Sequence, residues 1–411
     1  MVNAKQVRAG AAVTLAAVFI VMLVMPRALG SESGSETRGS GAPADLTYSI
    51  EERQRICEEV WRKVGLWYSY FDDKGIDWES VKPRYLDLAA GARSDREFFS
   101  CITGLLRELH DGHSYVYEYP KPISGAGARG TPRMRVVEAD GKPIVAEVSS
   151  GSDAEAKRVV PGLEIVSVDG QPAEDRIRSL IPLVTASTLW YARSTAVAAI
   201  LNGDLDKEVQ VELRRPDGAV FGVPLAREPF ERRPAAISAQ VLSGGIGLLR
   251  LPSFSASNLG LKSGDALVRE FDDALEQLRA TKAIIIDMRG NGGGDDAVAG
   301  RCAGRFFKSA VAFPSFQMRM VTLGVPWFAP RMGRSVSPRG LWQYTGPVVL
   351  LVDEFVVSSA EHFAAGMHDS GRATTIGHTT AGSSGNPVPL EVSGFKFQVS
   401  RWREYRADGS L

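Results

Sequence analysis

The segment Pro347–Pro387, PVVLLVDEFVVSSAEHFAAGMHDSGRATTIGHTTAGSSGNP, decides the fold of this 411-residue chain. It opens with the short apolar, β-branched run Pro347–Val352, which is typical of a parallel strand covered on both faces. Asp353–Val357 interrupts this run, and a helical pattern follows. Ser358 stands where the turn meets the helix, and Gly371 can adopt the left-handed conformation that ends a helix. The segment therefore predicts a strand, a tight turn and a helix, with a serine hydroxyl exposed at the turn.

Ser358 has two interpretations. The pattern Ser-x-x-Glu formed by Ser358 and Glu361 is a capping box, in which the serine side chain accepts from the backbone and the glutamate reaches back. Alternatively, a serine on a strand-to-helix turn, beside the free amides of the helix, is placed to act as a nucleophile. The local pattern alone favours the cap, because capping serines are common. Only the remainder of the sequence can distinguish the helix cap from the nucleophile.

From Arg232 onward the sequence alternates between strand and helix patterns. The strands are expected at Ile246–Leu251 and Ala283–Met288, and the helices at Asp265–Arg279 and Asp296–Phe307. Repeats of this kind predict parallel strands with helices on their faces.

A glycine-rich loop, RGNGGG at Arg289–Gly294, directly follows the second of these strands. The amides of such a loop can cradle a phosphate or stabilise an oxyanion. The loop matches neither common nucleotide-binding pattern, and G-x-S-x-G, which would indicate an α/β-hydrolase, is absent. Gly292 or Gly293, together with the Ser359 amide, could supply two oxyanion donors to a nucleophile at Ser358. The alternative is a tight turn chosen only for its geometry.

The N-terminal third of the chain is predicted to be helical. Apolar residues recur at helical spacing over Ile50–Tyr70, Ser80–Ala92 and Asp95–Leu109, and a short strand is expected at Tyr115–Tyr117. His113 lies between the last helix and this strand, directly after a glycine. It is either a residue that serves a nearby site or a plain surface residue at a corner.

A β-rich segment separates the helical region from the strand–helix repeats. Residues 119–130 are rich in proline and glycine and mark a boundary, after which Thr131–Glu228 alternates like a small β domain. Pro161–Gly170 predicts a strand and a hairpin turn with Asp-Gly at its tip, and Asp175–Leu201 is helical in pattern. This arrangement resembles a PDZ domain, which binds an extended peptide by adding it as a strand. The alternative is a β-rich domain that only packs on its neighbour.

Composition excludes several classes of protein. The formal net charge is zero and no basic block is present, so nucleic acid is not expected as a partner. Cys57, Cys101 and Cys302 are far apart and lack the spacing of a metal site, so buried free thiols are expected, with a Cys57–Cys101 disulfide as the alternative. No metal and no cofactor are expected.

Residues 1–30 have the pattern of an export signal. Lys5 and Arg8 form a basic start, an apolar run follows from Ala11 to Met25, and small residues at 28–30 offer a cleavage site. An uncleaved membrane anchor is the alternative, because a spanning helix needs about 20 apolar residues. Residues 31–46 predict a disordered linker. The protein is therefore expected to be periplasmic or extracellular, either released or held at the membrane by its N-terminus.

Two of these segments, IIIDMRGNGGG and LLVDEFVVSSAEHFAAGMHDSGRATTIG, resemble the tail-specific (C-terminal processing) serine peptidases. The PDZ-like segment between a helical head and the strand–helix repeats is similar to that family as well. The resemblance implies a multidomain α/β fold with a helical domain at 47–118, a PDZ-like domain at 119–230 and a crotonase/ClpP-like catalytic core at 231–411. It also implies that Ser358 is the nucleophile, because the family serine lies three places before the helix glutamate.

The same resemblance suggests the catalytic base. One branch of the family uses a lysine, but Ser383 occupies the matching position here. The tricorn-like branch uses a histidine from the region ahead of the PDZ domain, and His113 matches it as general base and then general acid. That branch also places a glutamate shortly after a "DG" turn, and the sequence ends at Asp408–Leu411, before that glutamate would follow.

The resemblance implies a serine endopeptidase whose substrates are proteins or peptides, recognised through the PDZ-like domain. Two other functions remain open from the sequence. One is a catalytically silent binding protein on the same fold. The other is a crotonase-like acyl-CoA enzyme, against which the PDZ-like segment and the export signal count.

Overall fold

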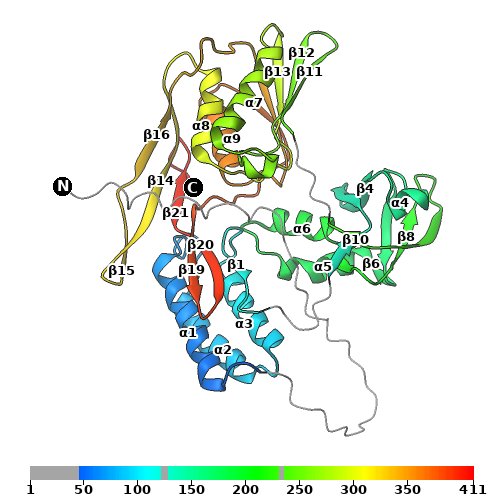
Figure 1. Cartoon of the computed structure of the whole chain (residues 1–411), viewed down its shortest axis with the longest axis vertical. Coiled ribbons are helices and arrows are strands. Elements are labelled where there is room, and N and C mark those ends of the chain that lie inside the picture. The colour runs from blue at the N-terminus through cyan, green and yellow to red at the C-terminus, as the bar shows by residue number, and fades with distance from the viewer. Residues whose placement is uncertain (1–45, 122–127, 231–235) are drawn as a thin grey trace. The chain divides into compact units, whose positions relative to one another are not determined.

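The computed structural model describes residues 46–121, 128–230 and 236–411 (Figure 1). These residues form two compact units. The first combines the described part of Arg233–Asn386 with Ser400–Leu411, and the second combines the described residues up to Arg232 with Pro387–Val399. The signal or anchor predicted at 1–30 and nearly all of the predicted linker lie outside the described residues. Nowhere in the described ranges does a helix combine the length and apolarity that crossing a bilayer requires.

A five-stranded sheet organises the first unit, in the order β11-β12-β13-β17-β18. Strands β12, β13, β17 and β18 run parallel, as the strand–helix repeats predict, whereas β11 pairs with β12 in the antiparallel direction at one edge. The antiparallel edge strand was not expected. The strand bounds are Ser238–Leu242 for β11, Ile246–Arg250 for β12, Ala283–Asp287 for β13, Val348–Val352 for β17 and Thr374–Gly377 for β18.

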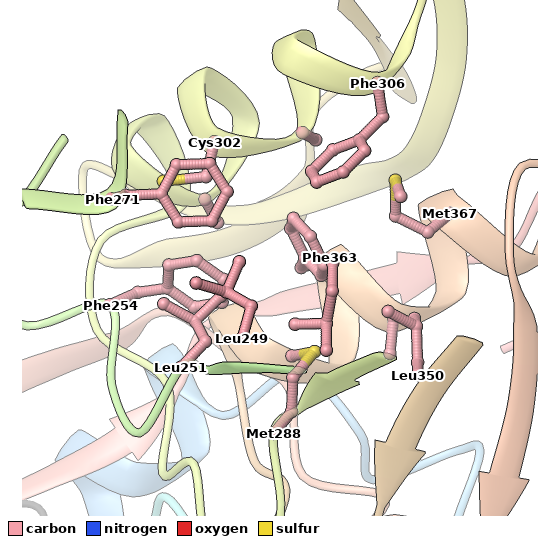
Figure 2. Packing of buried hydrophobic residues seen from close by; sticks show 14 of the residues in the cluster. Leu249, Leu251, Phe254, Phe271, Met288, Cys302, Phe306, Leu350, Phe363 and Met367 are labelled. Carbon is pink, nitrogen blue, oxygen red and sulfur yellow. The ribbon is translucent and has the colours of Figure 1, made fainter. Parts of the chain in front are cut away.

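The helices of this unit cover the sheet with one apolar cluster, which Figure 2 shows from close by. They are α7 (Gly264–Gln277), α8 (Asp296–Ala303) and α9 (Ser359–Asp369), with the short 3₁₀ turns η2 (Ser257–Leu259) and η3 (Gly304–Phe306). Phe271, Phe306 and Phe363 contribute the largest side chains from these elements. Helix α9 ends as expected, with Gly371 in the left-handed region at φ 69°.

The expected burial of β17 on both faces is wrong. Val348, Leu350 and Val352 are buried in the cluster, whereas Val349 and Leu351 are only half-buried. The side chains that β12 and β13 bury in the cluster lie on the same face of the sheet. The continuous apolar sequence therefore hides a strand that alternates between a fully buried and a half-buried face.

A second sheet in the first unit was not predicted. The long strand β14 (Val311–Thr322) pairs with β15 (Val325–Phe328) and β16 (Met332–Val336), and along part of its length with β21 (Trp402–Tyr405). All of these pairings are antiparallel.

The predicted helices of the N-terminal region are present in the second unit. They are α1 (Ile50–Trp67), α2 (Trp78–Gly91) and α3 (Asp95–Arg107), and they pack with a small sheet of β1 (Tyr115–Glu118), β20 (Phe395–Ser400) and β19 (Pro387–Val392). Phe395 packs against the rings of Phe98 and Phe99, with ring centroids 5.7 and 5.0 Å away. A hairpin from near the C-terminal end of the sequence thus completes the core of the N-terminal helices.

The three cysteines are free and buried, as expected, so the alternative Cys57–Cys101 disulfide is wrong. Both of those thiols point at the Tyr85 carbonyl oxygen, each 3.5 Å away.

The β-rich part of the second unit contains a sheet in the order β3-β4-β5-β8-β9, with β6 beside β5. The Asp-Gly hairpin tip occurs as predicted, with Asp169 and Gly170 both at positive φ. The segment predicted to be helical contains α5 (Ala173–Leu180), η1 (Ile181–Leu183) and α6 (Leu189–Ala198). The remaining elements are β2 (Arg129–Thr131), β3 (Met134–Ala139), β4 (Lys142–Val148), α4 (Asp153–Ala156), β5 (Glu164–Val168), β6 (Gln171–Pro172), β7 (Gly203–Asp204), β8 (Val209–Arg214), β9 (Val220–Leu225) and β10 (Glu228–Pro229).

Candidate active site

Ser358 lies at the corner between β17 and α9, as the sequence predicts, and its backbone is strained. Its φ of 59° and ψ of −127° fall in a region that residues with a side chain rarely adopt. The Ser358 amide donates to the Ser383 carbonyl oxygen at 2.9 Å and to Glu361 Oε2 at 3.2 Å. The surrounding structure therefore holds this serine in a conformation that it would not take by itself.

Glu361 connects the Ser358 corner to the loop 380–383. One carboxylate oxygen accepts from Thr380 Oγ1 and the Gly382 amide, both at 2.7 Å. The other accepts from the Ser383 amide at 2.8 Å as well as from Ser358. Burial raises the pKa of Glu361 above its ordinary value, and the four donors oppose that rise. The glutamate of the capping pattern thus bonds to far more than the start of its own helix.

Replacing Glu361 by alanine is expected to lower the free energy of unfolding by about 3 kcal/mol or more. The change removes the acceptor of four hydrogen bonds, and each buried donor left without a partner costs about 1–3 kcal/mol. Urea unfolding of the variant measures the effect. Glu270→Ala, an exposed position on α7, is the matched control and should shift stability by less than about 0.5 kcal/mol. An equal loss of unfolding free energy in the two variants would contradict the role given to Glu361.

The glycine-rich loop packs directly against the Ser358 corner. A Cβ at position 293 would lie 2.6 Å from the Val357 carbonyl oxygen and 2.9 Å from Ser358 Cβ, so only glycine fits there. Asn291 is fully buried, and its side chain holds the loop in place. Its amide nitrogen donates to the Leu251 carbonyl oxygen, and its amide oxygen accepts from the Gly293 amide, both at 2.9 Å. The Val357 amide in turn donates to the Asn291 carbonyl oxygen at 3.0 Å.

Two amides near Ser358 have no acceptor among the residues that the structure describes. The sequence offered Gly292 or Gly293 as one oxyanion donor, and the Gly293 amide is already bonded to Asn291. Within the described residues, neither the Gly292 amide nor the Ser359 amide has an acceptor in reach. The Ser359 hydroxyl donates to the Gly294 carbonyl oxygen at 3.0 Å. Gly292 is buried, and buried amides without a partner are rare, so this donor calls for an explanation.

Asp287 anchors the start of the glycine-rich loop. It is almost buried at the end of β13 and accepts from the Arg289 amide at 3.1 Å and from two Arg289 guanidinium nitrogens at 2.9 Å. Arg250 lies 2.8 Å from the same carboxylate. Burial raises the pKa of Asp287, but the hydrogen bonds from Arg289 and the charge of Arg250 outweigh it, and the net pKa lies below the ordinary value.

The lowered pKa of Asp287 predicts acid sensitivity. Since the unfolded chain binds a proton at this carboxylate more readily than the folded chain does, Asp287 stabilises the fold above its unfolded pKa of about 4. That contribution is lost as the pH falls through the lower folded pKa. Asp287→Asn should therefore be less stable than the parent at pH ~7, and the difference should shrink towards pH ~3. Thermal melts across this range measure it, with Asp273→Asn, at an exposed position on α7, as the control variant.

His113 is half-buried in the second unit, in a turn built around the buried Asp111. The His113 amide donates to Asp111 Oδ1 at 3.2 Å, and Ser114 Oγ donates to Asp111 Oδ2 at 2.7 Å. Ser187 Oγ approaches Asp111 Oδ1 at 3.4 Å, and Gln398 donates to the His113 carbonyl oxygen at 3.1 Å. The histidine backbone is thus fixed by its own turn and by Gln398, and Ser187 supports the turn through Asp111. Ser358, Gly292, Gly293 and Ser359 lie together in the first unit.

A partly buried ionic cluster lies behind helix α9. His362 Nδ1 is 2.6 Å from Glu404 Oε1, and the other oxygen of Glu404 accepts from Ser384 Oγ. Arg334 bonds to Asp296 at 3.0 Å and approaches His362 at 3.2 Å. This cluster links α9 to β16 and β21. Across the described part of the chain, no group of three or more His, Cys, Asp or Glu side chains is arranged to hold a metal ion.

Sequence reasoning missed several residues that support this geometry. Asn291, Asp111 and Glu404 were given no role, and Glu361 was seen only as part of a cap. A polar residue inside a glycine loop, or an aspartate two places before a candidate histidine, is a local signal that could have indicated Asn291 and Asp111. Nothing local distinguishes Glu404, whose partners lie far away in the sequence.

Two family profiles match the chain. Residues 245–409 match peptidase family S41, and residues 50–106 match the tricorn protease C1 domain. Carboxy-terminal processing protease CtpA of Bacillus subtilis is 24% identical over 358 residues, covering 83% of this chain and 66% of CtpA. A tricorn protease homolog of Streptomyces coelicolor is 25% identical over 274 residues, covering 61% of this chain and 22% of the homolog. The chain thus spans just under two thirds of the first relative and about a fifth of the second.

Solved structures agree on the fold. Mature CPAF, in a complex with lactacystin, superposes with a TM-score of 0.72 at 14% sequence identity, covering 88% of this chain and 91% of CPAF. The family resemblance drawn from the sequence is thereby confirmed, together with a multidomain α/β fold. The chain belongs to the tail-specific peptidase family S41, a family of serine-type peptidases.

Proposed function

We propose that this protein is an exported serine endopeptidase that hydrolyses peptide bonds of proteins or peptides, with Ser358 as the nucleophile. The strained backbone of Ser358 is the observation that carries the proposal. Strain of this kind persists only where the surroundings enforce it, and it gathers at functional sites. A plain helix cap would not need it, because a capping serine adopts an ordinary extended conformation, as Ser263 does before α7. Membership of a serine peptidase family supports the same assignment.

The Gly292 and Ser359 amides would stabilise the oxyanion that forms when Ser358 attacks a peptide carbonyl. Both amides lack an acceptor among the described residues and flank the Ser358 corner. Such preorganised donors are worth about 3–4 kcal/mol each in serine hydrolases. Gly293, offered by the sequence as the other candidate donor, would instead let the loop approach the corner closely, since its amide bonds to Asn291.

His113 would act as the general base that takes the Ser358 proton and then returns it to the leaving amine. Imidazoles titrate near neutral pH and suit both steps. The support is the rigid turn around Asp111 that holds the backbone of His113. A lysine base is not favoured, because Ser383 occupies the position of the family lysine. Asp111 would be a positioning residue for the histidine.

The remaining regions receive roles in the same proposal. Residues 47–118 would form a helical domain that carries His113, and residues 119–230 a PDZ-like domain that captures an extended substrate as an added strand. Residues 231–411 would form a catalytic core of the crotonase/ClpP type. Export rests on the signal-like pattern at 1–30, which lies outside the described residues.

Labelling with a fluorophosphonate, followed by peptide mapping, tests the proposal. The expected result is one modified site, at Ser358, together with hydrolysis of an unfolded protein substrate that the label blocks. Modification at another serine would contradict the assignment of the nucleophile. A chain that takes no label, cleaves nothing and still binds apolar ligands would instead be the catalytically silent binding protein.

A further inference from the structure

The β14–β15 hairpin carries an unusual residue at its apex. Thr322 pairs with Val325, so Leu323 and Gly324 form a two-residue turn, and both have positive φ, 51° and 78°. Turns of this type favour Asn-Gly, because a residue with a branched apolar side chain is strained there. Leu323 is also 99% exposed. Neither the backbone nor burial within the described residues explains a leucine at this position.

The apolar character continues along one face of the hairpin. Val325 is 63% exposed and Trp327 is 45% exposed, and residues two apart on a strand point to the same side. The Trp327 indole donates to Thr322 Oγ1 at 2.9 Å, so its polar atom is satisfied locally. Strand β21 pairs with β14 only over 315–318, which leaves the end of the hairpin as a two-stranded ribbon within the described sheet. In Figure 1, β15 and the end of β14 run away from the helices of their unit.

The charged side chains of the sequence segment that forms this hairpin have one sign. No acidic residue occurs in the sequence between Asp296 and Asp353, although the whole chain has zero net charge. The ribbon itself carries Arg319, whose guanidinium group lies over the ring of Phe328 at 5.4 Å. Arg331 follows β15 and lies further from the tip, where its guanidinium bonds to Ser315 Oγ and lies 4.3 Å from the Tyr405 ring centroid. A basic band thus lies behind an apolar tip.

We propose that the β14–β15 tip docks onto the surface of an anionic lipid bilayer. Leu323, Val325 and Trp327 would enter the boundary between headgroups and acyl chains, and Arg319 would face the lipid phosphates. Tryptophan with a satisfied indole suits this boundary, and basic side chains are attracted to anionic lipids. A narrow protruding tip fits a deformable surface better than a protein partner, which needs about 800 Å² of matching surface. The proposal goes beyond peptidase activity and does not depend on it.

Quenching of tryptophan fluorescence by brominated lipids tests the docking in the full chain. The chain has seven tryptophans, so Trp327→Phe defines the signal of Trp327. Vesicles of brominated phosphatidylcholine with phosphatidylglycerol should quench a component that Trp327→Phe lacks, and vesicles without phosphatidylglycerol should quench it much less. Equal quenching of the parent and Trp327→Phe would overturn the proposal.

Three variants make the test specific, with vesicle affinity as the readout. Leu323→Asn suits the turn, keeps the fold and should weaken binding about ten-fold, the effect of removing one large apolar side chain from the contact. Arg319→Gln should weaken binding only to vesicles that contain phosphatidylglycerol. Leu341→Asn changes another fully exposed leucine of the same unit and should leave binding unchanged.

Residues 1–30 are common to all variants, so any membrane binding of their own cancels in the comparison. Cleavage of a soluble peptide without vesicles should be equal in the parent and Leu323→Asn, which separates this test from that of the active site. If Leu323→Asn instead abolishes self-association and leaves vesicle binding intact, the tip is a contact with a second copy of the chain and the lipid proposal fails.

Discussion

Replacing Ser358 by glycine is expected to make the protein more stable and catalytically dead. Glycine adopts a φ of 59° and a ψ of −127° without penalty, whereas a residue with a Cβ in such a region pays about 1–3 kcal/mol. The extra freedom of glycine in the unfolded chain returns about 0.5–1 kcal/mol of that gain. The free energy of unfolding should therefore rise by about 1 kcal/mol. Peptide hydrolysis should fall by about 10⁴-fold or more, as when other serine peptidases lose their nucleophile.

Ser358→Ala separates the loss of activity from the gain in stability. Alanine removes the hydroxyl and keeps the Cβ, so activity should be lost with no gain in stability. Ser370→Ala, at the other end of α9, removes a hydroxyl that bonds to the Gly366 carbonyl oxygen and should retain labelling by the fluorophosphonate. Urea unfolding and labelling of the three variants measure both quantities. Labelling that persists in Ser358→Ala would sink the assignment, and a glycine variant less stable than the alanine variant would remove the argument from strain.

Local patterns predicted the elements that hold Ser358. The apolar run before Ser358, the helix after it and the left-handed Gly371 depend on residues close in sequence, and all three are present. The strand–helix repeats likewise predicted parallel pairing, because short crossover connections leave few other arrangements.

Long-range pairing could not be read in the same way. Strand β21 pairs with β14, although Trp402 and Met318 are far apart in sequence, and the hairpin Pro387–Val399 packs on helices at the other end of the chain. Strand patterns tell which face is apolar, and they do not tell which partner covers it. The pairing of β21 with β14 was missed for this reason. The edge strand β11 and the β14–β15 hairpin pair with their neighbours in sequence, and they were missed although their pairing is local.

In the candidate site, too, some features follow from local sequence and others only from contacts between distant segments. The position of Ser358 and its glycine-rich neighbour follow from motifs, since both depend on a few adjacent residues. The four hydrogen bonds that Glu361 accepts come from segments that meet only after folding. The hydrogen bond from the Asn291 side chain to the Leu251 carbonyl oxygen likewise joins two separate segments. The sequence therefore indicates a candidate for the reacting residue, whereas the residues that hold it in place emerge from tertiary contacts.

His113→Ala is expected to lower the rate of peptide hydrolysis by about 10⁴-fold, with little change in stability, if the histidine is the base for Ser358. Labelling by the fluorophosphonate should slow as well, because it needs the same activated hydroxyl. His110→Asn is a matched control three residues earlier in the same turn: His110 has a φ of 44°, which asparagine tolerates, and its side chain is exposed. This control should keep its activity within about three-fold, the range that neutral surface changes show.

Two further measurements distinguish a base from a residue that only supports the fold. Added imidazole should restore part of the activity of His113→Ala, because a small molecule can replace a missing proton acceptor and cannot repair a misfolded turn. Ser383→Ala should keep activity, since its backbone makes the bonds to Ser358 and Glu361 and a serine hydroxyl is no base at neutral pH. If Ser383→Ala instead lost as much activity as His113→Ala, and imidazole restored neither, position 383 would take part in the chemistry and the histidine plan would fail.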